Sequence, residues 1–211
     1  IVERDSWRKK SGSESWQEFL ISCPIKDYKV TTFMFGKYQG ENIAITLSTV
    51  EVLQINGVNI PDKSIYDGLE KTKNPGRMEI VSFEPMILLD GAHNVTGMTL
   101  LKESIEEGLN FSGFILILGI LKDKNINEIL EVITPIADVV ITTKSHNLRA
   151  CDPAILKEMI QDKEVVIIDD ISKAVDYAKS IASIKDIICI TGSLFTVGEA
   201  RDHIIKKIQK C

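Results

Sequence analysis

From Pro75 onward, short runs of β-branched apolar residues alternate with segments whose apolar residues recur at helical spacing. The apolar runs are nearly continuous, as in strands that are covered on both faces of a parallel sheet. They lie at 78–83, 86–89, 114–119, 138–142, 164–168 and 186–191, and the helical segments lie at 94–107, 125–133, 153–161, 171–180 and 194–208. This alternation predicts an α/β domain with a doubly wound, mostly parallel sheet.

The first 74 residues do not continue this alternation. Residues 1–22 are polar, with a loop expected at Ser11-Gly12-Ser13 and with Trp7, Trp16 and Phe19 as the only anchors. The Val, Thr, Phe and Tyr residues of 28–35 predict a strand. Helical spacing predicts helices over 43–53 and 62–73. In these helices Leu53 is expected to face the core and Asp62 to cap the second N-terminus.

The stretch Asn74-Pro75-Gly76 is a strong breaker and predicts a hinge between two domains, 1–74 and 75–211. Residues 1–74 have no obvious core of their own, so they are expected to be the end of another domain. Because the chain also begins without Met, it is expected to be part of a longer protein.

Charge and composition exclude several classes of partner. A net charge of −5 and an isoelectric point near 5.3 give no electrostatic footprint for nucleic acid or an anionic membrane. The longest apolar runs are far too short to span a bilayer. The four cysteines, at 23, 151, 189 and 211, have no zinc or disulfide spacing, which favours a cytoplasmic protein.

Common catalytic motifs are absent from the 211 residues. There is no G-x-x-x-x-G-K-[ST] phosphate loop, no G-x-G-x-x-G fingerprint and no G-x-S-x-G elbow. The three histidines fall in no metal-ligand spacing, so no metal site is predicted.

Polar residues nevertheless follow four of the predicted strands, where ligands bind in open α/β sheets. These strand ends are Asp90 to His93, 119–124, 142–146 with the following Arg149, and Thr191-Gly192-Ser193. Asp90 either caps the next helix or takes part in phosphate binding or proton transfer, and His93 is either packed or functional. Ser193 either caps a helix or helps to bind an anion. Near the hinge, Arg77 is either solvated or reaches a phosphate.

Several ordered motifs together resemble one family, the folylpolyglutamate and dihydrofolate synthases of the Mur ligase superfamily. In the second half they are Asn-Pro-Gly-Arg-Met-Glu (74–79), Leu-Leu-Asp-Gly-Ala-His-Asn (88–94), Gly-Ile-Leu-Lys-Asp-Lys (119–124), Arg-Ala (149–150) and Thr-Gly-Ser-Leu-Phe-Thr-Val-Gly-Glu-Ala-Arg (191–201). In the first half, Gly-Lys-Tyr-Gln-Gly-Glu-Asn (36–42) looks like the family element Gly-x-His-Gln-x-x-Asn. Tyr38 replaces its histidine, which puts any role of that side chain in doubt.

The resemblance implies that residues 1–74 end a central ATPase domain and that residues 75–211 form a C-terminal glutamate-binding domain. It also implies an ATP-dependent ligase of folate biosynthesis and one-carbon metabolism. Such an enzyme forms an acyl phosphate on a folate or pterin-type acceptor, and L-glutamate then attacks it. The expected ligands are therefore ATP, Mg²⁺, L-glutamate and that acceptor, with the Mg²⁺ ligands upstream of this chain.

Site residues carry over one by one from the matching motifs. Asn42, Arg77 and Asp90 match positions that contact ATP, Arg77 and Asp90 as the C-terminal domain closes. His93 and Ser193 match positions that bind the incoming glutamate. Asp90 and His93 are thus the catalytic candidates.

Some expectations concern the protein as a whole. Without a phosphate loop, the 211 residues alone are expected to be inactive, and the full-length protein is expected to be monomeric. Two alternatives stay open: another amino-acid ligase of the same superfamily, and a non-catalytic α/β binding or scaffolding domain.

Overall fold

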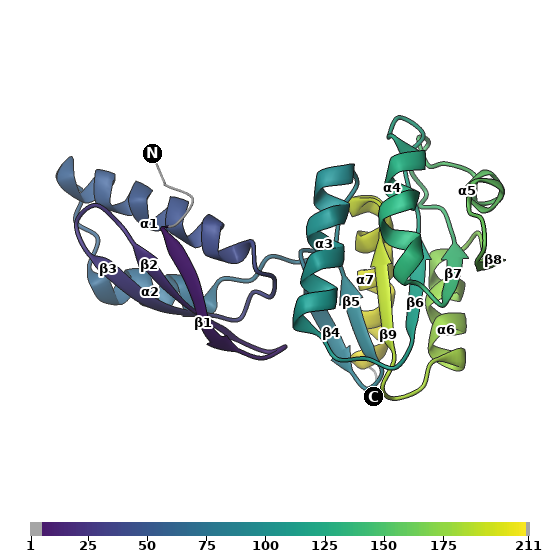
Figure 1. The fold of residues 1–211 in the computed structure, drawn as a ribbon, viewed down its shortest axis with the longest axis horizontal. Helices are drawn as coiled ribbons and strands as arrows, with labels where there is room; N and C mark the ends of the chain where they lie inside the picture. The colour runs from purple at the N-terminus through teal and green to yellow at the C-terminus, as the bar shows by residue number, and fades with distance from the viewer. Residues whose placement is uncertain (1–5, 210–211) are drawn as a thin grey trace. The chain divides into compact units, whose positions relative to one another are not determined.

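The computed structural model describes residues 6–209, so Cys211 lies outside the described part of the chain. It divides between Asn74 and Pro75 into two compact units, which are called here the first and the second unit (Figure 1). Among the described residues no helix has the length and apolar character needed to cross a bilayer.

The first unit is a three-stranded antiparallel sheet packed against two helices. Its elements are β1 (Trp7–Gly12), β2 (Gln17–Ser22), β3 (Asp27–Thr32), α1 (Gln39–Ile55) and α2 (Asp62–Lys71). Alternate residues of the strands point inward, so that Phe19 and Tyr28 are buried against Leu47 of α1 and Leu69 of α2. The unit therefore has its own hydrophobic core, which corrects the expectation that residues 1–74 lack one.

Residues 7–22 form a hairpin of β1 and β2, which the polar sequence does not indicate. The loop expected at Ser11-Gly12-Ser13 lies at the end of β1, where this hairpin turns. In β2 the buried residues Gln17, Phe19 and Ile21 alternate with more exposed ones, which is the period of a half-buried strand. In β1 only Trp7 is partly buried and the other residues are exposed. Apart from Trp7, whose ring packs edge-on against Phe19, this strand is held by backbone pairing, so its sequence carries little hydrophobic pattern.

Two details of the helices in the first unit differ from the predictions. Leu53 is 42% exposed, and Glu51 faces inward instead, where its carboxylate accepts hydrogen bonds from the backbone N–H groups of Ile25 and Lys26. Asp62 does not cap α2, since its carboxylate is bound by the Lys26 ammonium at 2.6 Å.

The second unit contains a six-stranded sheet in the order β4-β5-β9-β6-β7-β8. All neighbours are parallel except β4, which forms an antiparallel hairpin with β5. The strands are β4 (Glu79–Phe83), β5 (Met86–Leu89), β6 (Phe114–Leu118), β7 (Val139–Thr142), β8 (Glu164–Ile167) and β9 (Ile187–Thr191). The helices are α3 (Val95–Gly108), α4 (Ile126–Ile133), α5 (Pro153–Met159), α6 (Ile171–Ile181) and α7 (Leu194–Ile208), with a 3₁₀ turn at Thr134–Ile136.

Helices cover both faces of this sheet. Figure 1 shows α3 and α4 in front of the strands and α6 and α7 behind them. On the rear face, Ile171 and Val175 of α6 and Val197 of α7 pack against Ile117 and Ile190 of the sheet in one buried cluster. The predicted doubly wound, mostly parallel α/β fold is confirmed.

The topology places the ends of β5, β9 and β6 side by side at the centre of the sheet. The chain leaves β5 and β6 toward the front helices, whereas it leaves β9 toward α7 on the rear face. Such a reversal opens a crevice at the carboxyl ends of the strands. A binding site is therefore expected beside residues 90, 119 and 192.

Candidate functional site

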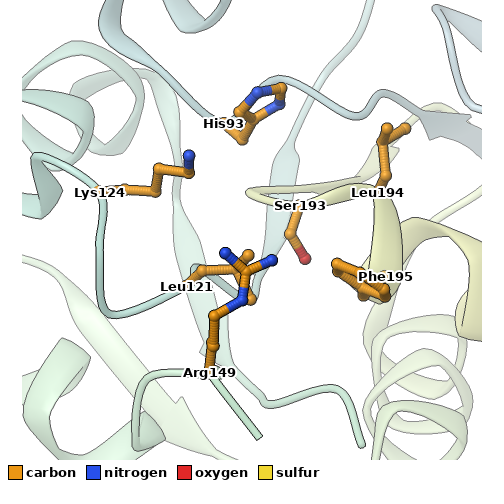
Figure 2. Close-up of a pocket in the computed structure, with 7 residues that line it drawn as sticks. All are labelled: His93, Leu121, Lys124, Arg149, Ser193, Leu194 and Phe195. Atoms are coloured by element: carbon orange, nitrogen blue, oxygen red, sulfur yellow. The ribbon is translucent and has the colours of Figure 1, made fainter. Parts of the chain in front are cut away.

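A pocket of about 170 Å³ lies at these carboxyl ends. Side chains from all four predicted strand ends line it: His93, Leu121, Lys124, Arg149, Ser193, Leu194 and Phe195 (Figure 2). Two of the predicted site residues, His93 and Ser193, are thus brought together although 100 positions separate them in sequence.

The imidazole of His93 is oriented by its own turn. Its Nδ1 lies 2.8 Å from the carbonyl oxygen of Gly91, and because a carbonyl can only accept, Nδ1 carries the proton. In the neutral ring Nε2 is then the acceptor. Nδ1 is used by the protein, so Nε2 is the ring atom that a ligand can engage.

Ser193 caps α7, as one of its two sequence readings predicts. Its Oγ accepts a hydrogen bond from Thr196 N at 3.1 Å and lies 2.8 Å from Thr196 Oγ1. The Thr196 hydroxyl donates to the carbonyl of Gly119 at 2.9 Å, so its oxygen must accept the proton of Ser193. This relay ties the start of α7 to the end of β6, and it engages the Ser193 hydroxyl within the protein.

The start of α7 also provides backbone donors that have no acceptor in the helical hydrogen-bond ladder of residues 6–209. Thr196 N and Val197 N bond to Ser193, whereas the N–H groups of Leu194 and Phe195 precede the helical hydrogen-bond ladder. Both residues line the pocket. The positive end of a helix dipole therefore faces this pocket, which favours an anionic group.

Two cations reinforce that preference. The ammonium of Lys124 and the guanidinium of Arg149 point toward the middle of the pocket (Figure 2). Their carboxylate neighbour is Asp123, at 3.3 Å from Lys124 Nζ and 3.6 Å from Arg149 Nη1. The sequence placed Lys124 and Arg149 at strand ends but assigned them no role, so the pocket adds two candidate binding residues.

The two loops that carry these cations are held together by backbone pairing. Lys122 N donates to the carbonyl of Arg149 and Cys151 N to that of Ile120, both at 2.8 Å. The segment 142–146 is attached to α7, because the Glu199 carboxylate accepts hydrogen bonds from the backbone N and from Nδ1 of His146. The hydrogen bond to Glu199 raises the pKa of His146, so the interaction between these two side chains is strongest at pH values below that raised pKa. Such pairings between distant segments leave no local signal in a sequence.

Asp90 does not cap α3, because Asn94 does. The buried Asp90 carboxylate instead accepts from the backbone N of Met78 and of Ala92, each at 2.8 Å. Burial raises the pKa of the Asp90 carboxyl above its ordinary value. These two hydrogen bonds act in the opposite direction, as does the positive charge of Arg77.

Arg77 lies beside the Asp90 turn. A Cβ placed on Gly91 would be 3.3 Å from Arg77 Nη1, which puts the guanidinium against that turn. The structure therefore brings Arg77 and Asp90 together within the second unit.

Asn42 belongs to the first unit, where it is exposed near the start of α1 and donates to Gln39 Oε1 at 3.1 Å. Tyr38 is the residue that precedes α1.

Within residues 6–209, no three His, Cys, Asp or Glu side chains gather closely enough to hold a metal ion.

Comparisons with known proteins agree with this picture of the second unit. The family model "Mur ligase, glutamate ligase domain" matches residues 76–194, which is more than half of the chain. The dihydrofolate synthase/folylpolyglutamate synthase of Bacillus subtilis is 26% identical over 193 residues, covering 89% of this chain and 44% of that protein.

Two solved structures resemble the whole chain. The folylpolyglutamate synthase of Thermotoga maritima has a TM-score of 0.80 and 31% identity, covering 96% of this chain and 47% of that one. The Mycobacterium tuberculosis folylpolyglutamate synthase complexed with ADP has a TM-score of 0.86 and 23% identity, covering 95% and 48%, and it supports the fold alone. The chain spans less than half the length of each of these three proteins. With a family model that matches residues 76–194, the chain belongs to the Mur ligase family and carries its glutamate ligase domain.

Proposed function

We propose that this chain is part of an ATP-dependent ligase that joins L-glutamate to a folate or pterin-type carboxylate. The observation that carries the proposal is the pocket, in which Lys124, Arg149 and the first turn of α7 surround one cavity. A dicarboxylic amino acid presents two anionic groups to such donors. The likeness to the Bacillus and Thermotoga enzymes supports this choice of amino acid and acceptor.

In the proposed reaction, the acceptor carboxylate attacks the γ-phosphate of ATP, forming an acyl phosphate and releasing ADP. The amine of glutamate then attacks the acyl carbon, and inorganic phosphate leaves. We assign the glutamate carboxylates to Arg149, Lys124 and the start of α7, and we assign its amine to His93 Nε2, the free acceptor of that ring. Holding the amine in a fixed orientation is the main contribution that such a pocket makes to the rate.

Arg77 and Asp90 are proposed to contact ATP, together with Asn42 of the first unit. A guanidinium suits the charge that builds up on a transferring phosphoryl group. Ser193 is proposed to act on glutamate indirectly, by capping the helix whose first backbone N–H groups bind it. Its own hydroxyl is already hydrogen-bonded to Thr196. ATP and Mg²⁺ are proposed for the complete ligase. The 211-residue chain alone, which contains no phosphate-loop motif, is expected to show no turnover.

Binding of the amino acid can be tested on the chain itself. Adding L-glutamate is expected to shift the backbone amide NMR signals of Leu194 and Phe195, and Arg149→Met is expected to weaken this binding by about tenfold, since a hydrogen bond to a charged group is lost. The control is Lys157→Met, which removes a cation on α5 outside the pocket lining. An Arg149→Met protein that binds L-glutamate as tightly as the Lys157→Met protein would contradict the assignment.

A further inference from the structure

The short loop from Gly76 to Met78 has a conformation that needs external support. Gly76 and Met78 both have positive φ values, 70° and 47°. For a residue with a side chain, the left-handed region costs about 1–2 kcal/mol, so Met78 tends to leave it. Met78 nevertheless stays there and is only 2% exposed. Neighbouring groups must therefore hold this loop.

Three hydrogen bonds fix its backbone. Met78 N donates to Asp90 Oδ2 at 2.8 Å, and Gly91 N donates to the carbonyl of Gly76 at 2.8 Å. The third bond runs from Gly76 N to Glu79 Oε2, also at 2.8 Å. Two of these bonds attach the loop to the Asp90 turn, and the third attaches it to the first residue of β4.

Glu79 is fixed in turn by α7. Arg201 Nε lies 3.0 Å from Glu79 Oε1 and 2.9 Å from Oε2, and both side chains are partly buried. The helix that begins at the pocket is thus linked through Arg201 and Glu79 to the loop that carries Arg77.

The side chain of Arg77 contrasts with its backbone. Its neighbours Gly76 and Met78 are held by the bonds above, whereas within residues 6–209 its guanidinium has no hydrogen-bond or ion-pair partner. The hydrogen bonds described above hold the backbone of Arg77 in place. The five N–H donors of its guanidinium are left to bind an anionic ligand. Arg201, by comparison, spends its Nε donor on Glu79.

We propose that Glu79 and Arg201 are positioning residues, which hold the Gly76–Met78 loop so that Arg77 points at the phosphates of the nucleotide. This inference rests on the proposed function, since Arg77 is assigned to ATP there. Neither Glu79 nor Arg201 touches the ligand, and both act through the orientation of Arg77. Substitutions at Glu79 or Arg201 should therefore lower kcat/KM for ATP and leave KM for L-glutamate unchanged.

The kinetic test uses the product of the complete reading frame that encodes this chain. Arg201→Met is expected to lower kcat/KM for ATP by about tenfold, because a small misplacement of a binding group is costly, and to leave KM for L-glutamate unchanged. Arg201→Lys should recover part of the loss. In an Arg77→Ala background, Arg201→Met should add less than about twofold, since both changes remove the same interaction. Lys207→Met, which removes another α7 ion pair, to Asp176, is the matched control.

Three results would overturn the proposal: an unchanged kcat/KM for ATP in Arg201→Met, equal losses for ATP and glutamate, or effects of Arg77→Ala and Arg201→Met that multiply. Hydrogen exchange in the 211-residue chain tests the loop independently of any ligase activity. Arg201→Met is expected to speed exchange at the Gly76 amide by about tenfold with the Lys207→Met protein unchanged. Unaltered exchange at Gly76 would refute the positioning role even if the complete protein shows no ligation, a result that would by itself overturn only the proposed function.

Discussion

Asp90→Asn is expected to lower ATP-dependent ligation by the complete gene product by about 100-fold, the scale that is typical of losing one preorganised electrostatic group. The substitution keeps the size of the side chain but removes its charge beside Arg77 and His93. It also replaces one of the two acceptor oxygens with an NH₂ donor, which leaves the backbone N–H of Met78 or of Ala92 without its acceptor and should cost about 1–3 kcal/mol of folding stability. Activity is measured as ADP released in the presence of L-glutamate and acceptor.

The control for Asp90→Asn is Asp138→Asn at the opposite end of the sheet. Asp138 Oδ2 accepts from the backbone N of Phe114 at 2.8 Å, so the same chemical change disturbs a similar hydrogen bond. Asp138 precedes β7 and lies far along the strands from the pocket residues. Asp138→Asn should keep near-normal activity, and a comparable loss in both variants would show that Asp90 matters only for folding.

Gly192→Ala is expected to destabilise the second unit by about 3 kcal/mol, from a strained backbone and an overpacked contact together. Gly192 has a φ of 104°, which residues with a side chain rarely adopt. An added Cβ would lie 2.7 Å from the carbonyl oxygen of Gly119, and backbone atoms cannot move aside as a side chain can. The measurement is urea unfolding of the chain, followed by circular dichroism.

Gly198→Ala makes the matched comparison. Gly198 lies within α7, and among the described residues a Cβ there would meet no atom within 4 Å beyond its chain neighbours and the adjacent backbone of its own helix. Alanine in a helix interior is better than glycine by about 0.5–1 kcal/mol, so this variant should be slightly more stable than the parent. If Gly192→Ala unfolds at the same urea concentration as Gly198→Ala, then the close approach of the β9 and β6 ends is not required.

The features that sequence predicted best are those with a strong local period. The strand at Met86–Leu89 and the helix at Leu194–Ile208 have the predicted bounds, because a short apolar run and an apolar stripe identify such elements directly. The β1 strand was missed because its residues are nearly all exposed, which leaves no apolar pattern to read. Asp62 was misassigned because a capping residue and the partner of an ion pair look alike in sequence.

Part of the candidate site was predictable from the order of the strands. Because parallel strands end at one edge of a sheet, His93, Ser193 and the stretch 119–124 could be expected to converge. What no local pattern could provide is which distant side chains pair. Glu79 and Arg201 end two of the motifs that signalled the family, yet they are 122 positions apart, and only the fold shows that they form an ion pair.

We propose that the complete protein is a glutamate ligase, and ADP release from the purified product of the complete reading frame tests this proposal most directly. ATP, L-glutamate and one member of a panel of folates and pterins are supplied together, and each is then omitted in turn. We expect ADP and the amide product to form in equal amounts only when all three are present. ADP release that does not depend on glutamate, or amide formation with another amino acid and none with L-glutamate, would contradict it.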